Sequence, residues 1–276
     1  HLAVVARIGV GYDAVDVPAC TQAGIALTIT PDGVRRPVAS AALASLLALA
    51  HRLPLKDRLT RQGRWSEKPQ HMGIGLRGRT LGLVGMGNIG TEILKLVAPH
   101  EMTTLVADPF ADAEKVSDLG AHLLELPAML EQADFVIICC ALTDQTHHLI
   151  DAEALHLMKP TAHLINVARG PIVDQVALTT ALQEQIIAGA ALDVFETEPV
   201  DPDDPLLTLD NVIVSPHALA WTDESFRLMG ESAFAGILAA SQGKAPDFIV
   251  NRDVLDSAHF QDRLAACARR RQQESR

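Results

Sequence analysis

Three residues that can move protons or hold a carboxylate each stand at the end of an apolar run. Arg169 follows "HLINVA", Glu198 ends "ALDVFETE", and His217 ends "VIVSPH". A guanidinium fork binds a carboxylate through two parallel hydrogen bonds, and an imidazole exchanges a proton near neutral pH. A carboxylate bonded to the other ring nitrogen fixes the tautomer of that imidazole and favours its charged form. The set suits hydride chemistry on an α-hydroxy or α-keto acid, with His217 as acid and base.

A glycine-rich turn adds a second chemical feature. The segment "TLGLVGMGNIG" places Gly85, Gly87 and Gly90 in a GxGxxG pattern between an apolar run and a helical segment. The first glycine permits a tight turn, the second lets backbone approach a pyrophosphate, and the third allows close packing of helix and strand. Asp108 ends the next apolar run, where a carboxylate accepts hydrogen bonds from ribose hydroxyls and repels a 2′-phosphate. The pattern predicts a bound dinucleotide, NAD in preference to NADP.

The elements that must position these residues alternate regularly along the chain. The expected strands are 80–85, 103–108, 134–140, 162–167, 189–194 and 211–216, and the expected helices between them include 89–98, 127–133 and 174–185. Apolar strands separated by helices predict a parallel sheet covered on both faces, which is a doubly wound α/β (Rossmann) fold. Because parallel strands end at one edge, Arg169, Glu198 and His217 are expected to converge there.

The two flanks of this block have a different character. Residues 1–50 hold an apolar strand, the loop "GVGYD" and an alanine-rich helix, and a second helix is expected at 222–242 before an irregular, charged end. Neither flank is large enough to bury a core by itself, so the two are expected to join. We therefore predict an NAD-binding domain at 51–219 and a discontinuous substrate domain formed by 1–50 and 220–276.

Charge and apolar runs exclude two classes of partner. The formal net charge of −11 argues against a nucleic-acid surface, although the tail 263–276 is basic. That tail is interpreted as a solvated helix end. The longest apolar run, residues 38–50, is too short to cross a bilayer and suits a buried helix.

Cysteine and histidine spacing indicates no metal site. The four cysteines show no CxxC pattern, which suits a reduced, cytoplasmic setting without a disulfide framework. The pair His147–His148 lacks a third ligand at a suitable spacing. Cys139 and Cys140 are interpreted as small strand residues, with position 140 open to oxidation.

Five segments together resemble a known family. "RIGVGYDAVD", "GMGNIG", "NVARGPIVD", "ALDVFETEP" and "SPH" occur in the order and spacing of the D-isomer-specific 2-hydroxyacid dehydrogenases, between about residues 3 and 252. The resemblance implies an NAD-dependent enzyme that interconverts a small D-2-hydroxy acid and its 2-keto acid, with Arg169, Glu198 and His217 as the catalytic set. It also implies a smaller flavodoxin-like substrate domain and a homodimer. The family has a further strand–helix–strand portion before "VVARIGVG", so the substrate domain is expected to be N-terminally incomplete.

The resemblance implies further binding residues as well. These are Asn88 and Ile89 at the pyrophosphate, Cys140, Val167 and Ala168 beside the nicotinamide, Asp193 at its carboxamide, and the backbone N–H groups of Val10 and Gly11 at the substrate carboxylate together with Arg169.

Two alternatives stay open at this point. The same fold and the same three residues occur in non-catalytic, NAD-sensing regulators of the corepressor kind, and "HHLI" and "AW" in this chain are similar to them. A fragment with a defective substrate domain is the other alternative. Fold alone does not separate an enzyme from a sensor, because function depends on the site.

Overall fold

The computed structural model describes residues 2–274, with side chains to residue 271. The chain forms two compact units. Unit 1 combines His1–Pro37 with Trp221–Arg276, and unit 2 is Val38–Ala220. The boundary between Pro37 and Val38 lies inside the helix Pro31–Ala50 and not at residue 50. The reason is that the second half of this helix packs on the sheet of unit 2. The assignment of 51–219 and of 1–50 with 220–276 as functional domains stays a prediction.

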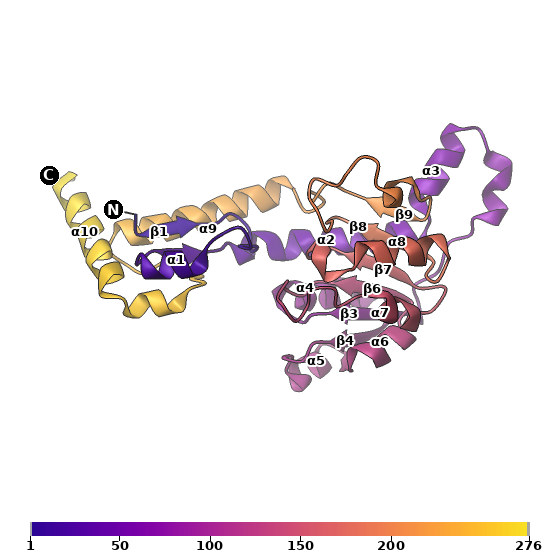
Figure 1. The fold of residues 1–276 in the computed structure, drawn as a ribbon, viewed down its shortest axis with the longest axis horizontal. Coiled ribbons are helices and arrows are strands. Elements are labelled where there is room, and N and C mark those ends of the chain that lie inside the picture. The colour runs from indigo at the N-terminus through magenta and orange to yellow at the C-terminus, as the bar shows by residue number, and fades with distance from the viewer. Residues whose placement is uncertain (1, 275–276) are drawn as a thin grey trace. The chain divides into compact units, whose positions relative to one another are not determined.

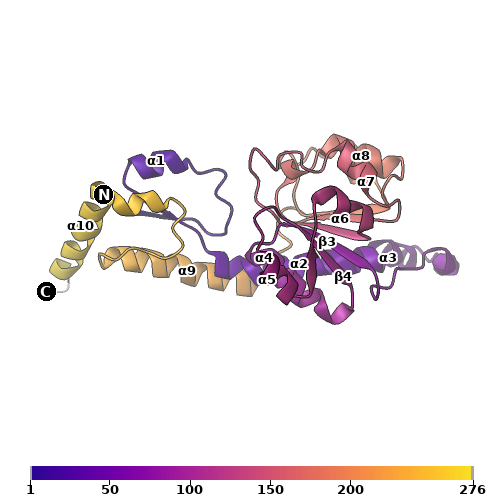
Figure 2. The ribbon, with the colours of Figure 1, turned by 90° about the horizontal axis from the view of Figure 1, so that it is seen from below.

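Unit 2 is built on a parallel sheet of seven strands in the order β5-β4-β3-β6-β7-β8-β9 (Figures 1 and 2). The strands are β3 (Thr80–Val84), β4 (Thr103–Ala107), β5 (Ala121–Leu123), β6 (Phe135–Ile138), β7 (His163–Asn166), β8 (Gly189–Leu192) and β9 (Val212–Val214). The order reverses between β3 and β6, as in doubly wound sheets, where ligands bind beyond the carboxyl ends of the strands. This confirms the predicted fold class and the six expected strands, while β5 was not expected.

Helices cover both faces of this sheet. Those that pack on it are α4 (Asn88–Val97), α5 (Ala113–Asp118), α6 (Leu126–Gln132), α7 (Ala152–Leu157) and α8 (Gln175–Gln183). Helix α3 (Leu53–Arg61) instead extends away from the sheet and packs with the 3-10 turn η1 (Trp65–Gln70) (Figure 1). Three further 3-10 turns are η2 (Ala98–His100), η3 (Gly170–Ile172) and η4 (Pro205–Thr208). The second half of α2 (Pro31–Ala50) packs with α4 and α5 on one face, and α6, α7 and α8 pack on the other.

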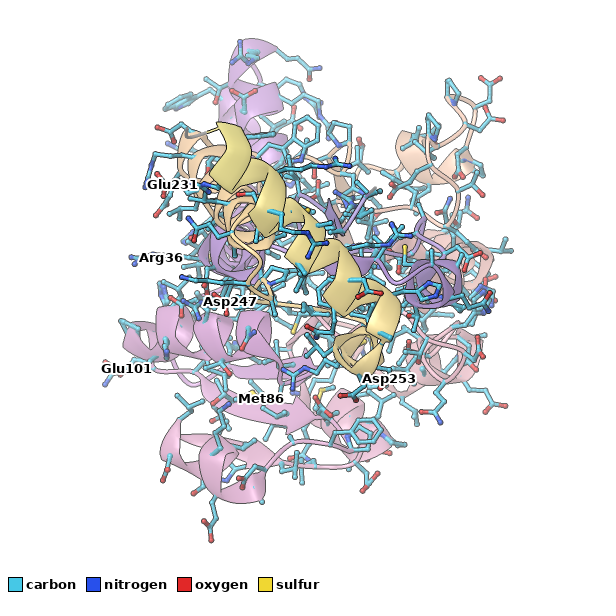
Figure 3. All side chains as sticks on the ribbon, turned by 90° about the vertical axis from the view of Figure 1, so that its left-hand side faces the viewer. Arg36, Met86, Glu101, Glu231, Asp247 and Asp253 are labelled. Carbon is cyan, nitrogen blue, oxygen red and sulfur yellow. The ribbon has the colours of Figure 1, made fainter. Side chains whose placement is uncertain are left out.

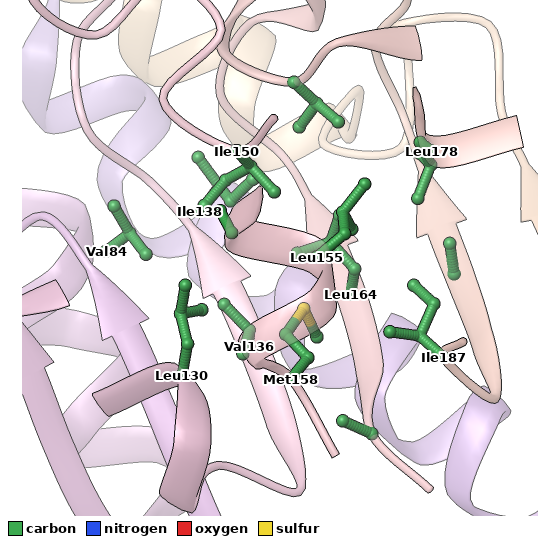
Figure 4. Close-up of a cluster of buried hydrophobic side chains, with 14 of the residues drawn as sticks. Val84, Leu130, Val136, Ile138, Ile150, Leu155, Met158, Leu164, Leu178 and Ile187 are labelled. Carbon is green, nitrogen blue, oxygen red and sulfur yellow. The ribbon is translucent and has the colours of Figure 1, made fainter. Parts of the chain in front are cut away.

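Two hydrophobic layers result from the alternation of side chains along each strand. On β6, Phe135 and Ile137 enter the layer beneath α2 and α4, while Val136 and Ile138 enter the opposite layer. Figure 4 shows Ile138 among the side chains of the second layer. Because every residue of β6 is buried, the strand is apolar on both faces, as expected for the centre of a parallel sheet.

Unit 1 is smaller. Its elements are β1 (Val4–Ala6), α1 (Val17–Gln22), β2 (Ala26–Thr28), the first turns of α2, α9 (Asp223–Ser241), η5 (Arg252–Asp256) and α10 (Ala258–Glu274). The strands β1 and β2 pair in parallel. The buried Asn251 accepts from the amide of Leu27 at 2.9 Å and donates to the carbonyl of Ile25 at 3.0 Å, which joins the C-terminal segment to β2. The flavodoxin-like assignment of this unit stays a prediction.

The end of the chain differs from expectation. We predicted an irregular, charged segment after the helix at 222–242, but residues 258–274 form α10. The reason is a narrow apolar stripe: Phe260 and Leu264 are one helical turn apart and are buried in the core of unit 1. On α9, by contrast, Arg227 and Glu231 form an exposed ion pair of 2.9 Å, and Glu231 extends outward (Figure 3).

Helix α2 carries a proline in its interior. Pro37 has no N–H to donate to the carbonyl of Gly33 four residues earlier. The hydroxyl of Ser225, at the start of α9, donates to that buried carbonyl at 3.0 Å instead. A side chain at Gly33 would collide with Met229, so α9 lies close against this turn.

The length of α2 also differs from expectation. The apolar run 38–50 is too short to cross a bilayer, but the helix begins at Pro31 and has 20 residues, and an 18-residue window within it has a mean hydropathy of 1.2. By length and composition alone it passes as a membrane span. Over half of that window is buried inside the protein, as in the core helix of a soluble protein.

Candidate active site

The glycine-rich turn lies at the carboxyl end of β3, beside the point where the strand order reverses. Gly85 has a φ of 99°, and a Cβ there would lie 2.7 Å from the backbone of Cys140. A Cβ at Gly90 would lie 2.5 Å from the carbonyl oxygen of Gly85, so helix α4 starts directly against the turn. Both positions therefore require glycine.

The start of α4 is open. Gly87 is its N-cap, so no side chain of its own caps the first turn. Among the described residues, nothing lies within 4 Å of where a Cβ of Gly87 would stand. The amides of the first turn, including Asn88 and Ile89, present N–H groups and the positive end of the helix dipole. This end of the helix fits the pyrophosphate of a dinucleotide.

Asp108 follows β4 and faces the glycine-rich turn. Its Oδ2 accepts from the amide of Met86 at 2.7 Å, and its Oδ1 accepts from the amide of Phe110 at 2.9 Å. The carboxylate is therefore fixed next to the turn that would hold the pyrophosphate, at the position where ribose hydroxyls are bound in this kind of fold.

His217 and Glu198 are paired in the structure. His217 Nδ1 lies 2.7 Å from Glu198 Oε2, and Glu198 Oε1 accepts from the amide of Phe195 at 3.0 Å. Because a carboxylate only accepts, Nδ1 carries the proton and the ring is held in one tautomer. Both side chains are partly exposed, at 45% and 36%, so the pair can meet a ligand. The structure thus brings together two predicted residues that are 19 positions apart.

Asp193 holds the segment that carries His217. The backbone of His217 has a φ of 52°, a left-handed conformation that is rare without glycine. Its amide donates to the carbonyl of Asp193 at 2.7 Å. The buried carboxylate of Asp193 accepts from the hydroxyl of Ser215 at 2.7 Å and from the amides of Ala218 and Leu219. These bonds fix the strained turn, a role that the sequence analysis missed.

Arg169 stands at the carboxyl end of β7, half-buried and extended. Its Nη1 donates to the carbonyl of Ala168 at 2.7 Å. The buried side chain of Asn166 donates to the carbonyl of Arg169 and accepts from the amide of Ala168, at 2.9 and 3.0 Å. Asn166 therefore shapes the turn that carries Arg169, and its only sequence signal is a polar residue inside an apolar run.

The remaining predicted residues fall into two groups. Cys140 follows β6, and Val167 and Ala168 follow β7, at the same sheet edge as the glycine-rich turn. Burial raises the pKa of the Cys140 thiol to about 11, and it raises the pKa of the Cys139 thiol further. Both thiols therefore stay protonated. Val10 and Gly11 belong to unit 1, in the loop after β1.

Known proteins are similar to this chain in sequence and in fold. The family model described as "D-isomer specific 2-hydroxyacid dehydrogenase, NAD binding domain" matches residues 43–218. A glyoxylate reductase of Korarchaeum cryptofilum is 41% identical over 257 residues, which cover 92% of this chain and 77% of that protein.

Two solved structures are also similar. A Thermus thermophilus protein has a TM-score of 0.83 and 36% identity, covering 90% of this chain and 78% of that one. The NADPH-dependent glyoxylate/hydroxypyruvate reductase of Sinorhizobium meliloti, solved with NADP and malonate, has a TM-score of 0.78 and 36% identity, covering 86% and 73%.

The chain belongs to the D-isomer specific 2-hydroxyacid dehydrogenase family. It is a dehydrogenase that uses a nicotinamide dinucleotide to interconvert a 2-hydroxy acid and its 2-keto acid. The predicted family, reaction class and kind of cofactor are therefore confirmed. The roles of individual site residues, the choice of NAD and the particular substrate remain predictions.

Proposed function

We propose that this protein reduces glyoxylate or a similarly small 2-keto acid to the corresponding 2-hydroxy acid, which has the D configuration where the product is chiral, with NADH as the preferred cofactor. The observation that carries the proposal is the pair of His217 and Glu198, 2.7 Å apart at the carboxyl edge of the cofactor-binding sheet. Relatives about 40% identical to this chain are named glyoxylate reductases, which favours a small substrate.

The proposed roles follow from the chemistry of each group. Arg169 binds the substrate's carboxylate and polarises its carbonyl. The nicotinamide, when bound, supplies the hydride. With Nδ1 committed to Glu198, His217 gives a proton from Nε2 to the carbonyl oxygen, and the negative charge of Glu198 stabilises the charged ring before transfer. Val10 and Gly11 are proposed to hold the same carboxylate through their N–H groups.

The cofactor contacts are proposed in the same way. Asn88 and Ile89 would meet the pyrophosphate at the N-terminus of α4, and Gly85, Gly87 and Gly90 give the backbone access that this needs. Cys140, Val167 and Ala168 would line the nicotinamide side. Asp193 would reach the carboxamide only through the part of its carboxylate that the His217 segment leaves open.

The test is NADH consumption with a panel of glyoxylate, hydroxypyruvate, pyruvate and bulkier keto acids. We expect turnover that is fastest with the smallest acids. Arg169→Lys keeps the charge but loses the bidentate fork, so kcat/KM should fall by about two orders of magnitude or more. His217→Ala should remove most turnover while NADH binding persists. Absence of turnover with every acid, alongside tight NADH binding, would favour the NAD-sensing regulator instead.

We also propose a homodimer. Residues of unit 2 that follow α2 leave large apolar side chains exposed, namely Leu53, Trp65 and Met72. Exposed apolar surface of this kind is typical of a protein interface. Light scattering on the purified protein would give twice the mass of one chain, and a monomer at micromolar concentration would contradict the proposal.

We propose a cytoplasmic location, without nucleic-acid or membrane partners. The four cysteines are all free thiols, which suits a reducing compartment. The net charge of −11 disfavours nucleic acid. Cell fractionation followed by detection of the protein tests the location.

A further inference from the structure

His148 lies in the loop after β6 and is bonded to two other loops of unit 2. Its amide donates to the carbonyl of Pro171 at 2.8 Å, in the turn directly after Arg169. Its ring Nε2 lies 2.8 Å from Glu196 Oε1, in the loop that carries Glu198. Both of these side chains are about two-thirds buried, so water competes weakly for the bond.

Further bonds keep both attachments rigid. The amide of Ile150 donates to the carbonyl of Ile172 at 3.0 Å, which extends the bond between His148 and Pro171 into a short parallel bridge. The second oxygen of Glu196 accepts from the amide of Gln175 at 3.1 Å, and the amide of Glu196 donates to the side chain of Gln175 at 3.0 Å. The carboxylate of Glu196 is thus held on both sides.

The two loops also touch through their backbones. A Cβ at Gly170 would lie 1.8 Å from the carbonyl of Phe195, so the turn after Arg169 rests directly on the segment that leads to Glu198. Such a contact fixes a distance but does not by itself prevent sliding, which the bonds between Gln175 and Glu196 oppose at the far end of the turn. The bonds of His148 to Pro171 and to Glu196 oppose that sliding, because each loop is held by a directional hydrogen bond.

We infer that His148 is a positioning residue: it fixes the placement of Arg169 relative to the pair of Glu198 and His217. The inference rests on the proposed function for the roles of those three residues. Hydride and proton transfer to one carbonyl require that Arg169, which would bind the carboxylate, and His217, which would donate the proton, are correctly placed relative to each other. A displacement of about 1 Å can lower the rate by about a hundredfold. His148 touches neither reacting group, so its effect passes entirely through the two loops.

The kinetic test compares His148→Ala with His148→Gln. The amide nitrogen of glutamine can take the place of Nε2 and donate to Glu196, whereas alanine leaves that carboxylate oxygen without its donor. For keto acid reduction we expect kcat to fall by about ten- to a hundredfold in His148→Ala, with KM changed less than about threefold. His148→Gln should restore most of kcat, and NADH affinity should match wild type in both variants.

His147→Ala is the matched control. It removes the neighbouring exposed ring, whose centroid lies 4.1 Å from that of His148, and leaves the bond to Glu196 in place. Its kcat should stay close to wild type. A His148→Ala protein with wild-type kcat would overturn the inference, as would equal losses in His148→Ala and His148→Gln.

A measurement without turnover separates this inference from the proposed function. The ring N–H that His217 donates to Glu198 should give a downfield proton resonance that is lost in His217→Ala. We expect His148→Ala to shift or broaden that resonance and His148→Gln to leave it in place. If the wild type reduces no keto acid, the proposed function fails, but the inference is still decided by this resonance. An unchanged resonance in His148→Ala would overturn it.

Discussion

At the scale of single residues, Asp193 and Asn166 do as much to shape the site as the groups proposed to react. Asp193 is 8% exposed, and its carboxylate accepts hydrogen bonds from three donors in the segment around His217. Without that acceptor, each buried donor would be left unpaired, which costs about 1–3 kcal/mol of folding free energy per donor. The turn already contains the unfavourable φ of His217. A substitution at Asp193 should therefore damage the proposed acid before it affects any cofactor contact.

The carboxylate of Asp108 is expected to select the cofactor. Wild-type kcat/KM should be higher with NADH than with NADPH, because the charge repels a 2′-phosphate. Asp108→Asn removes the charge and keeps one side-chain oxygen, which can accept from the amide of Met86 or of Phe110 but not from both. The ratio of the two kcat/KM values should move toward NADPH by about tenfold, equivalent to about 1.4 kcal/mol.

Asp112→Asn is the control for that change, since Asp112 is a nearby carboxylate that caps α5 by accepting from the amide of Glu114. Its cofactor ratio should equal that of wild type. Equal use of NADH and NADPH by the wild type would refute the role of Asp108.

At the scale of elements, the two ends of β7 have different roles: its first residue packs in the core, and its last residue shapes the proposed active site. His163 at its start is buried and stacks on Phe135 with ring centroids 5.3 Å apart. Burial, reinforced by the nearby charge of Arg52, lowers the pKa of His163 to about 4. At the other end of the strand, Asn166 shapes the turn of Arg169.

The low pKa of His163 makes stability depend on pH. The unfolded chain takes up a proton near pH 6.5, while the folded protein holds the ring neutral down to about pH 4. The stabilisation that the neutral His163 gives to the folded state is therefore complete above pH 6.5 and is lost progressively as the pH falls from 6.5 to 4. Below pH 4 the free energy of unfolding no longer changes through this residue. The full size of the stabilisation is roughly 3 kcal/mol.

His163→Phe should keep the stacked ring and remove that dependence. Urea unfolding at several pH values between 4 and 7 measures it, and the free energy of unfolding should fall less steeply with acid in the variant. His156→Phe is the control, because His156 is exposed on α7 and bonds only its own helix at 2.7 Å. Parallel curves for wild type and His163→Phe would contradict the assignment.

The sequence predicted long, strongly patterned elements and missed short or weakly patterned ones. The central strands were found because β3, β6, β7 and β8 are largely apolar and almost every residue in them is buried. Strands β2 and β5 have three residues each, too few for a period to show, and the equally short β1 and β9 were found only because they lie in the apolar runs "LAVVARIGV" and "NVIVSP". Helix α10 is mostly polar and depends on contacts with unit 1, which local pattern does not reveal.

The same limit applies to the site. Arg169, Glu198 and His217 could be placed at one sheet edge from the sequence, because each follows a strand. The side-chain bonds of His148 and Asp193 could not, because their partners come from separate loops whose registers are set only in the folded chain. The bonds of Asn166 are local, but its role was hidden because it is one polar residue inside an apolar run.

At the scale of the whole molecule, the two units differ in how much they bury. Unit 2 has a hydrophobic layer on each face of its sheet, whereas the core of unit 1 consists, among the described residues, of a few small and large side chains around Phe260. On α9, Phe234 and Leu238 remain 73% and 50% exposed and contribute little burial. Local stability follows buried apolar area, so unit 1 should open more often.

Amide hydrogen exchange tests that difference. After correction for intrinsic rates, amides of β1 and β2 should exchange at least about tenfold faster than those of β6 and β7. Addition of NADH should slow exchange around the glycine-rich turn. Equal protection in the strands of both units would show that they unfold as one.

The bond between Ser225 and Gly33 has a consequence for how this chain tolerates change. Pro37 removes the donor that the carbonyl of Gly33 would otherwise meet, and a hydroxyl 192 positions from Gly33 replaces it. Ser225→Ala should therefore lower the free energy of unfolding only while proline occupies position 37. With any residue that has an N–H at position 37, the Gly33 carbonyl gains a backbone donor and the Ser225 hydroxyl is no longer needed. Positions 37 and 225 form an epistatic pair, and descendants of this sequence are expected to covary there.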